Sequence, residues 1–492
     1  MPSNNFEIID TTIAAIQQAY KNGVLTVRDL VQLYLDRIES YDQSGPKINS
    51  IITVNPRALD EADRLDAASS FVGPLHGIPI IMKDQADVSE MPTTMGSLLF
   101  KDHMPDRDCF VAKKLKEAGA IFIAKATLGE MGAGDTHGSL FGSTKNVYDL
   151  ERTAGGSSGG SGAAVSANFA TVAIGQEGFA SIRRPSIWNG VVGMRPTAGL
   201  VSRGGVYAGW PMINGSLGPM SRSVTDLAKL LDCMVGYDPT DPITAHGVGQ
   251  APKSYSETLN SHALEGARIG IIRESFGHRA EPDSDDFAQI DSLFNSAVGD
   301  LKSAGAKIID PIEIAEMKEL LGKRARNLED EEQSFLLYAS GSANCPYATR
   351  EEILESPTFS QTSHGVQQRW GTSDTPEQYG EYLRARDLLM TRFLAVMADH
   401  KLDAIVHKAV EHQPTLIKDG INPPWIDQWG APHINTFLIF VPSVVVPAGF
   451  TKEKLPGGIT FLGRPFDDAK MIQLAYAYEQ ATKHRRAPAC VP

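Results

Sequence analysis

The sequence predicts an α/β protein, built from short buried strands that alternate with amphipathic helices. An apolar run at residues 78–82 is followed by the helix-like CFVAKKLKEAGA and then by the apolar IFIAKA. Apolar runs this short are typical of buried strands, and their alternation with helical stretches is typical of layered α/β folds. The strand-like ARIGIIRE and the late TFLIFVPSVVVPAGF extend the pattern towards the C-terminus.

Residues 11–40 predict two amphipathic helices ahead of these strands. Ile13, Ile16 and Tyr20 share one face of the first helix. Thr26 is a typical capping residue for the second helix. The apolar run of that helix includes Leu30, Leu33, Leu35 and Ile38. We therefore expect an N-terminal helical arm.

The later elements predict one domain rather than several. SVTDLAKLLDCMVG predicts a capped helix, and DDAKMIQLAYAYEQAT predicts a final helix. Residues 310–435 are more polar and less regular than the rest. Because the chain shows no internal repeat and no long linker, we expect a single domain over residues 1–492 with an inserted cap region at about 310–435.

Composition and charge exclude several classes of protein. The apolar fraction of 42% and the charged fraction of 21% are those of a globular chain and exclude a disordered or coiled-coil one. Lys and Arg number 46 against 59 for Asp and Glu, which gives a net charge of -13. This balance disfavours nucleic-acid backbones and anionic membranes, so we expect neither partner.

The cysteines and histidines of the sequence predict neither a metal site nor a framework of disulfide bonds. Cys109, Cys233, Cys345 and Cys490 are too few and too scattered for either a disulfide framework or a zinc ribbon, and no histidine lies in an H-E-x-x-H cluster. No apolar run approaches the roughly 18–20 residues that span a bilayer. We expect a cytoplasmic protein, and a secreted origin stays open if a signal peptide was removed.

Lys83 ends the apolar run GIPIIMK and is a candidate base. Desolvation on a buried strand disfavours the ammonium form, so such a lysine can be neutral near pH 7. The alternative is a lysine at a strand end that extends its ammonium to water.

The run TAGGSSGGSGAA contains Ser157 and Ser158 and has two interpretations. Its composition alone is typical of a flexible linker, whereas its paired glycines also permit close backbone approach. The run formally matches a G-x-S-x-G nucleophile elbow centred on Ser158, but no apolar strand precedes it. It lacks the ending of a phosphate-binding loop, which argues against nucleotide binding.

Ser181 lies in a loop of small residues, EGFASIRRPS, just before a predicted helix. Successive backbone amides in such a loop can point at an oxyanion. The alternative is a serine that caps the helix. The spacing joins the three candidates, because Ser157 follows Lys83 by 74 residues and Ser181 follows Ser157 by 24.

These residues and their neighbours resemble the amidase signature family of serine hydrolases, which use a Ser-cisSer-Lys triad. The resemblance is carried by LHGIPIIMKD, FGSTKNVYD, AGGSSGGSGAAVSA, SIRRPSIWNGVVGMRPT and VPSVVVPAGFTKEKLPGGITFLGRPFDDA. It covers about residues 70–235 and 436–482. It implies one large domain with a mixed central sheet covered by helices on both faces.

The resemblance also implies catalytic roles. Lys83 matches the family's base, Ser157 the cis-serine that relays the proton, and Ser181 the nucleophile that forms an acyl-enzyme. The resemblance further implies an oxyanion hole made by the backbone amides of Gly178, Phe179, Ala180 and Ser181.

Two further residues have implied supporting roles. Met131 falls in the segment that lines the acyl pocket in relatives, where it acts through its backbone, and Arg183 orders the loop after the nucleophile.

The loop before Ser181 departs from the family pattern. The family usually has two glycines there, whereas this chain has Phe179 and Ala180. If either position needs a positive φ angle, the side chain would strain the loop. The Phe179 ring either narrows the site or packs behind it. We expect the oxyanion hole to survive, because backbone amides rather than side chains form it.

The expected function is cofactor-independent hydrolysis of the C–N bond of a linear, non-peptide amide. Trp210, Trp370, Trp425 and Trp429 lie in variable regions and favour an aromatic or apolar substrate group, with core packing as the alternative. Carbamate (urethane) or ester hydrolysis by the same mechanism, the glutaminase subunit of a tRNA-dependent amidotransferase, and an inactive binding protein of the same fold stay open. We expect a small-molecule amide or carbamate as partner, and a monomer or homodimer.

Overall fold

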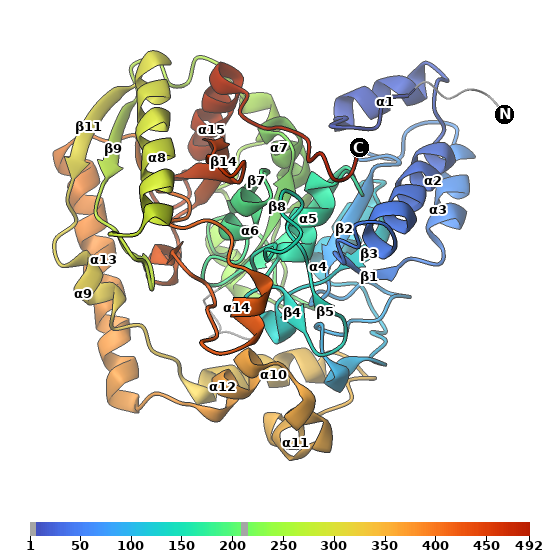
Figure 1. Ribbon diagram of the computed structural model, residues 1–492. Helices are drawn as coiled ribbons and strands as arrows, with labels where there is room; N and C mark the ends of the chain where they lie inside the picture. Colours follow the sequence, from blue (N-terminus) through green and yellow to red (C-terminus); the bar gives the residue numbers. More distant parts are fainter. Residues whose placement is uncertain (1–5, 208–214) are drawn as a thin grey trace.

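The computed structural model describes residues 6–207 and 215–492 and confirms the predicted α/β class (Figure 1). Within these residues the chain builds an eleven-stranded sheet of order β1-β3-β2-β6-β8-β7-β14-β15-β12-β9-β11. The pairs β3–β2, β2–β6, β12–β9 and β9–β11 are parallel, and the other neighbouring pairs are antiparallel. The sheet is therefore mixed, as the family resemblance implies.

The strands of this sheet are short and mostly buried. They are β1 (Ile51–Val54), β2 (Pro79–Lys83), β3 (Ile121–Ala126), β6 (Val172–Glu177), β7 (Val192–Arg195), β8 (Ser216–Ser221), β9 (Arg268–Ile272), β11 (Lys307–Ile312), β12 (Ala404–Lys408), β14 (Ser443–Phe450) and β15 (Pro456–Leu462). Two small ribbons lie outside it, β4 (His137–Gly138) with β5 (Gly142–Ser143) and β10 (Gly277–His278) with β13 (Ala431–Pro432).

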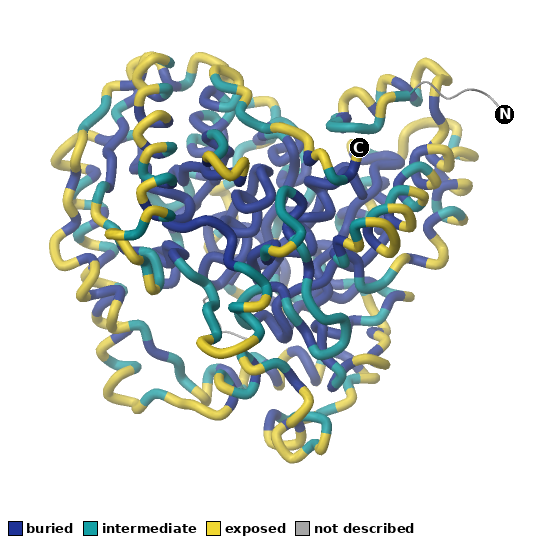
Figure 2. Tube along the Cα trace, viewed as in Figure 1, coloured by how far each residue is buried: buried dark blue, intermediate teal, exposed yellow. Residues whose placement is uncertain are grey.

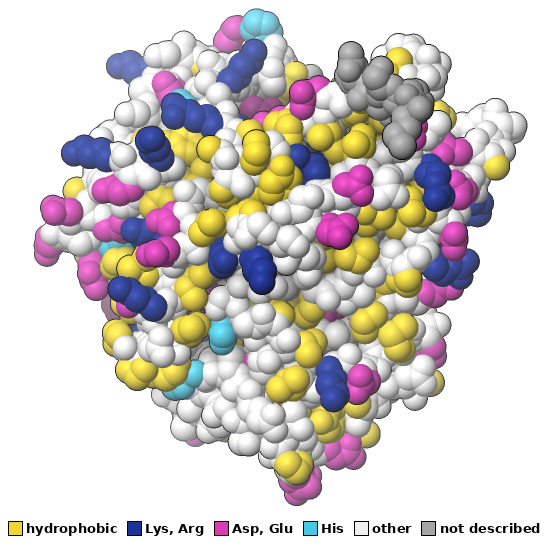
Figure 3. Space-filling model, turned by 45° about the vertical axis from the view of Figure 1, so that its right-hand side comes forward, with side chains coloured by type: hydrophobic (Ala, Val, Ile, Leu, Met, Phe, Trp, Pro, Cys, Tyr) yellow, Lys and Arg dark blue, Asp and Glu magenta, His cyan; other side chains and the backbone are white. Residues whose placement is uncertain are grey.

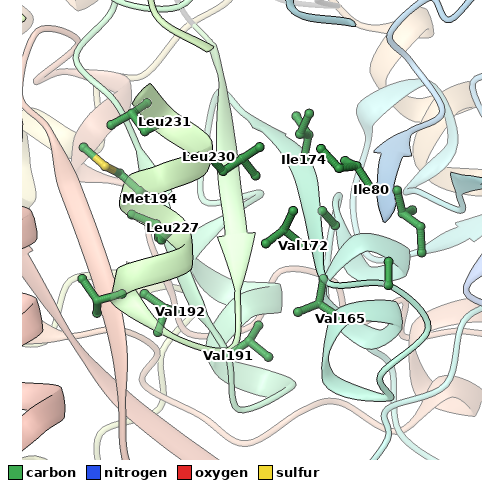
Figure 4. Packing of buried hydrophobic residues seen from close by; sticks show 14 of the residues in the cluster. Ile80, Val165, Val172, Ile174, Val191, Val192, Met194, Leu227, Leu230 and Leu231 are labelled. Atoms are coloured by element: carbon green, nitrogen blue, oxygen red, sulfur yellow. The ribbon is translucent and has the colours of Figure 1, made fainter. Parts of the chain in front are cut away.

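Helices cover both faces of the sheet. One group is α5 (Gly159–Ser166) with α6 (Arg183–Trp188), which contact each other and the strands β6, β7 and β14. A second group is α4 (Phe110–Glu117), α7 (Val224–Met234), α8 (Asp285–Ser303) and α15 (Asp468–Thr482). Figure 4 shows apolar side chains of β6 and of α7 directed into one continuous core, and Figure 2 shows that buried chain fills the centre of the molecule.

The N-terminal helices form as predicted, and they belong to the main core. They are α1 (Ile13–Lys21) and α2 (Val27–Arg37), followed by α3 (Ala58–Asp66) near the β1 edge of the sheet (Figure 1). The Thr26 side chain caps α2 by accepting a hydrogen bond from the Asp29 backbone N–H. In α2, Val31 and Tyr34 are fully buried, while Leu33 and Leu35 are only half-buried. The helical period places the first two beside Leu30 on the core side.

The region described as more polar and less regular in the sequence, residues 310–435, holds several helices joined by irregular connections. It contains α9 (Met317–Leu321), α10 (Leu328–Ser340), α11 (Arg350–Glu355), α12 (His364–Gly371), α13 (Pro376–Asp399) and α14 (Ile417–Ile421). β12 also lies here, yet it joins the main sheet beside β9 and β15. α13 buries Tyr382, Ala385, Leu389, Phe393 and Met397, a helical spacing that its many polar residues obscure in the sequence.

The surface carries charges of both signs. Figure 3 shows Lys and Arg interspersed with Asp and Glu on the face that it draws, with small apolar patches between them. Among the described residues no helix is long and apolar enough to cross a membrane.

Candidate active site

Lys83 ends β2, which lies between β3 and β6 in the most buried part of the sheet. Its side chain is fully buried, and its Nζ lies 2.7 Å from Ser157 Oγ and 3.2 Å from the carbonyl oxygen of Gln176. Burial lowers the pKa of Lys83 well below its ordinary value of 10.5, although the charge of Glu177 opposes this shift. The lysine therefore does not extend to water, and it is suited to accept a proton.

Ser157 lies in the loop that precedes α5. The peptide bond between Gly156 and Ser157 is cis. The Gly129 N–H donates to the Ser157 carbonyl at 2.9 Å, and Arg184 Nη2 donates to the Gly156 carbonyl at 2.9 Å. All residues from 155 to 166 are buried. The linker interpretation of this glycine- and serine-rich run is therefore wrong, because its glycines serve close packing.

Ser158, the centre of the formal elbow motif, has a structural role. Its Oγ lies 3.2 Å from both the backbone nitrogen and the carbonyl oxygen of Gln176, so it holds the loop against β6. Residues 148–152, just before the run, form no strand of their own. The geometry therefore does not support Ser158 as a nucleophile.

Ser181 lies between the end of β6 and the start of α6. Its carbonyl oxygen accepts a hydrogen bond from the Ser158 N–H at 3.1 Å, and its side chain is 7% exposed. This contact brings the Ser181 loop against the Ser157 loop, which in turn contacts Lys83. The loop of Ser181 thus lies against the loop of Ser157 through its backbone, and Lys83 contacts the Ser157 side chain.

Residues 178–181 form a buried loop whose backbone has no left-handed residue. Neither Phe179 nor Ala180 has a positive φ angle, so the strain considered for these positions is not present. Within the described part of the chain, the N–H groups of Phe179, Ala180 and Ser181 donate to no protein acceptor. Free, buried backbone donors of this kind can stabilise an oxyanion.

A buried ion pair fixes the end of this loop. Glu177 Oε2 accepts hydrogen bonds from the backbone N–H groups of Ile182 and Arg183, and Glu177 Oε1 pairs with Arg183 Nε at 2.7 Å. Arg183 also donates to the Phe179 carbonyl at 3.1 Å. Burial alone would raise the pKa of Glu177, but Arg183 and these hydrogen bonds lower it. Arg183 therefore orders the loop rather than facing a substrate.

The Phe179 ring packs into an aromatic and cationic cluster. It stacks on His433 with ring centroids 4.5 Å apart, meets His278 edge-on at 5.8 Å, and lies 4.9 Å from the Arg324 guanidinium. It lines a cavity of about 520 Å³ with these residues. The ring is 5% exposed, so it is held in place by packing.

A second cavity, of about 490 Å³, lies on the side of the Ser157 loop. It is lined by residues 133–137, and the Thr136 N–H donates to the Gly155 carbonyl at 2.8 Å. Asp135 and Asp427 also line it, as does Trp425, which stacks on His364 with centroids 4.2 Å apart. His278 and Arg279 line both cavities, so the two adjoin.

The remaining predicted residues are placed as follows. Met131 is fully buried and has a φ of 52°. Its N–H donates to the Met95 carbonyl at 2.8 Å, and its side chain lines neither cavity. Trp370 is buried in a hydrophobic cluster, and Trp429 stacks on His412. Trp210 lies outside the described residues. Of the predicted tryptophans that the structure describes, Trp425 is therefore the one that lines a cavity beside the site.

Sequence reasoning did not identify Arg184 as a site residue. Its Nη2 lies 2.6 Å from Asp135 Oδ1, besides donating to the Gly156 carbonyl. It therefore joins the Ser157 loop to the wall of the second cavity. The only signal in the sequence is the doubled arginine in SIRRPS, which does not distinguish Arg184 from Arg183. In the described ranges, no group of three or more His, Cys, Asp or Glu side chains could hold a metal ion.

Comparisons with known proteins agree with this fold. The family model described as Amidase matches residues 29–472, so the chain belongs to the amidase family. It is 31% identical to a glutamyl-tRNA(Gln) amidotransferase subunit of Methanosarcina barkeri, over 97% of this chain and 98% of that protein. It is 29% identical to a probable amidase of Arabidopsis thaliana, over 99% of this chain and 93% of the relative.

A solved structure shows the same likeness. The native peptide amidase of Stenotrophomonas maltophilia superposes with a TM-score of 0.83 at 30% identity, covering 98% of this chain and 99% of that one. The amidase signature resemblance read from the sequence is thereby confirmed, and the chain is a hydrolase of this family.

Proposed function

We propose that the protein hydrolyses the C–N bond of a linear, non-peptide amide through an acyl-enzyme on Ser181. The observation that carries this proposal is the buried contact of 2.7 Å between Lys83 Nζ and Ser157 Oγ, with the Ser181 loop bonded to the adjoining residue. A lysine whose pKa is lowered by burial can hold a free electron pair at neutral pH.

In the proposed mechanism, neutral Lys83 takes the proton of Ser157, and Ser157 takes the proton of Ser181. The Ser181 oxygen attacks the amide carbonyl and forms the acyl-enzyme. The proton returns by the same path to the leaving nitrogen, and water then releases the acyl group. The backbone N–H groups at 178–181 hold the oxyanion, where a single well-placed donor contributes roughly 3–4 kcal/mol to lowering the barrier.

The second cavity supports an aromatic or apolar substrate group, since Trp425 offers a flat surface there. We also propose that the backbone of Met131 contacts the acyl group of the substrate. Carbamates and esters present a similar carbonyl to Ser181, so they are included in the substrate panel below.

A covalent probe tests the proposal. We expect a fluorophosphonate to add once to the wild-type protein, by intact mass, and not to Ser181→Ala, with turnover from a panel of aryl amides, carbamates and esters by the wild type alone. A probe adduct that persists in Ser181→Ala would refute Ser181 as the nucleophile. Absence of both adduct and turnover in the wild type would favour a binding protein of the same fold.

A second candidate function is that of a glutaminase within an amidotransferase, which is favoured by the relatives that carry amidotransferase names. This function would require partner subunits. Ammonia release from glutamine, and co-purification of other proteins with the full-length chain, distinguish it from a stand-alone amidase.

A further inference from the structure

The cavity beside Phe179 is lined by basic side chains. They are His278, Arg279, Lys318, Arg324 and His433. Among the described residues that line this cavity, none is Asp or Glu. The chain as a whole has 59 acidic and 46 basic residues, so a cavity with basic side chains only departs from the average surface. Such a concentration of positive charge attracts anions.

Three of these side chains supply the positive charge at neutral pH. Arg279 and Lys318 are exposed and form no ion pair within the described ranges. The Arg324 guanidinium lies over the Phe179 ring. Burial, together with Arg279 and Arg324, lowers the pKa of His278 to about 4, and burial and Arg324 lower that of His433 as well. The two histidines are therefore neutral hydrogen-bonding groups on the cavity wall.

One carboxylate that contacts the cavity wall is already engaged. Glu411 accepts hydrogen bonds from Ser275 Oγ at 2.6 Å and from the Phe276 N–H at 2.9 Å. It fixes the segment that carries His278 and Arg279 rather than neutralising the cavity. Asp427 lines the adjoining cavity and is the acidic group that acts on His278. The lining of the basic cavity itself holds no carboxylate among the described residues.

This cavity lies beside the loop that carries Ser181. Phe179 belongs both to the cavity wall and to the loop that holds the candidate oxyanion donors. Two peptide units separate it from Ser181, so their Cα atoms lie at most about 7.6 Å apart. Ser181 itself does not line the cavity, so a substrate bound there would reach the cavity with an arm that extends past Phe179.

From these contacts we propose that the cavity binds a carboxylate carried by the substrate, so that the preferred substrates are amides with an anionic arm. The inference rests on the proposed function and names its substrate class. The guanidinium groups of Arg279 and Arg324 match the planar, bidentate geometry of a carboxylate. The stacked rings of Phe179 and His433 offer an apolar wall for the carbon chain of the arm.

Matched substrate pairs test the proposal and show on which side of the amide the carboxylate lies. In the first pair, glutaryl-p-nitroanilide carries a carboxylate on the acyl side and pentanoyl-p-nitroanilide is its neutral partner. In the second pair, N-benzoylglycine carries the carboxylate on the amine side and N-propylbenzamide is its neutral partner. We expect kcat/KM for the charged member of one pair to exceed that of its neutral partner by about tenfold, the scale of one charged hydrogen bond. Higher ionic strength should reduce this preference.

Substitutions at the mouth of the cavity distinguish the effect of its positive charge from that of changing any exposed charge nearby. The double variant Arg279→Gln, Lys318→Gln should abolish most of the preference for the charged substrate. Lys323→Gln is the matched control, because Lys323 is exposed near Lys318, pairs with Glu381 and does not line the cavity. Equal kcat/KM values within both pairs in the wild type, or a preference that the double variant retains, would overturn the proposal.

Direct binding keeps the test independent of turnover. Calorimetric titration of the wild-type protein with pentanoate and with pentan-1-ol compares a ligand that has a carboxylate with one that has none. Tighter binding of pentanoate that is lost in the double variant supports the site even if no amide is cleaved. Identical binding of the two compounds overturns it even if neutral amides are cleaved, and the proposed amidase function then stands alone.

Discussion

Replacing Lys83 with methionine tests whether this lysine is neutral in the folded protein. Methionine is close in length and apolar, so it fills the buried site without the amine. The wild-type side chain has no exposed surface, and burial is the largest cause of its lowered pKa. We expect the substitution to lower kcat by roughly 10²- to 10⁴-fold, the usual contribution of a general base.

The same substitution should change how stability depends on pH. Between the lowered folded-state pKa and the ordinary value of 10.5, the unfolded chain holds a proton on Lys83 that the folded chain lacks. The wild-type free energy of unfolding therefore rises with pH in this window, by up to about 1.4 kcal/mol per pH unit. Lys83→Met has no such group. The variant should be most stabilised relative to the wild type at low pH, and its advantage should shrink as the pH rises.

Chemical denaturation of both proteins across the alkaline range measures this difference. Lys323→Met is the control, since it removes the ammonium of a lysine that is 44% exposed rather than buried. Its pH profile should run parallel to that of the wild type. Parallel profiles for Lys83→Met would mean that Lys83 binds its proton equally in both states, and this would refute its role as a neutral base.

Two further substitutions test the loops around the site. Arg184→Leu should lower kcat by at least about tenfold in steady-state assays, because it removes the donor to the Gly156 carbonyl and the cation beside Asp135. Arg184→Lys should recover part of this loss. An unchanged kcat in Arg184→Leu would contradict the positioning role of Arg184. The double variant Phe179→Gly, Ala180→Gly should change kcat/KM by less than about tenfold, because both residues already have ordinary φ angles. A gain of several hundredfold in that assay would instead show that the native loop is poorly formed for catalysis.

The buried strands and their order of appearance were predictable because local patterns encode them. The apolar run before Lys83 is continuous, and β2 forms where that run predicts it. The glycine-rich loop was ambiguous for a physical reason: composition does not tell whether glycine serves flexibility or close approach. A Cβ on Gly160 would clash with the backbone of Thr127, and one on Gly156 with that of Gly134, so here the glycines serve close approach.

The contacts around Phe179 were not predictable, because they join segments that are distant in the sequence. The stack of Phe179 on His433 depends on how β13 pairs with β10, and neither two-residue strand has a recognisable pattern. The contact of Arg184 with Asp135 depends in the same way on how the loops are arranged. Periodicity identifies which side of an element is buried, and it does not identify which distant residue lies opposite.

The loop before Ser181 shows how the departure from the family's two glycines is compatible with a formed site. Two glycines would give the backbone of such a loop more conformational freedom. In this chain side chains hold both ends of the loop. Glu177 binds the backbone after the nucleophile, and the Phe179 ring is fixed between His433 and Arg324. The same ring forms the wall of the basic cavity. Phe179 therefore belongs to two features at once, the loop that carries the candidate oxyanion donors and the wall of the basic cavity.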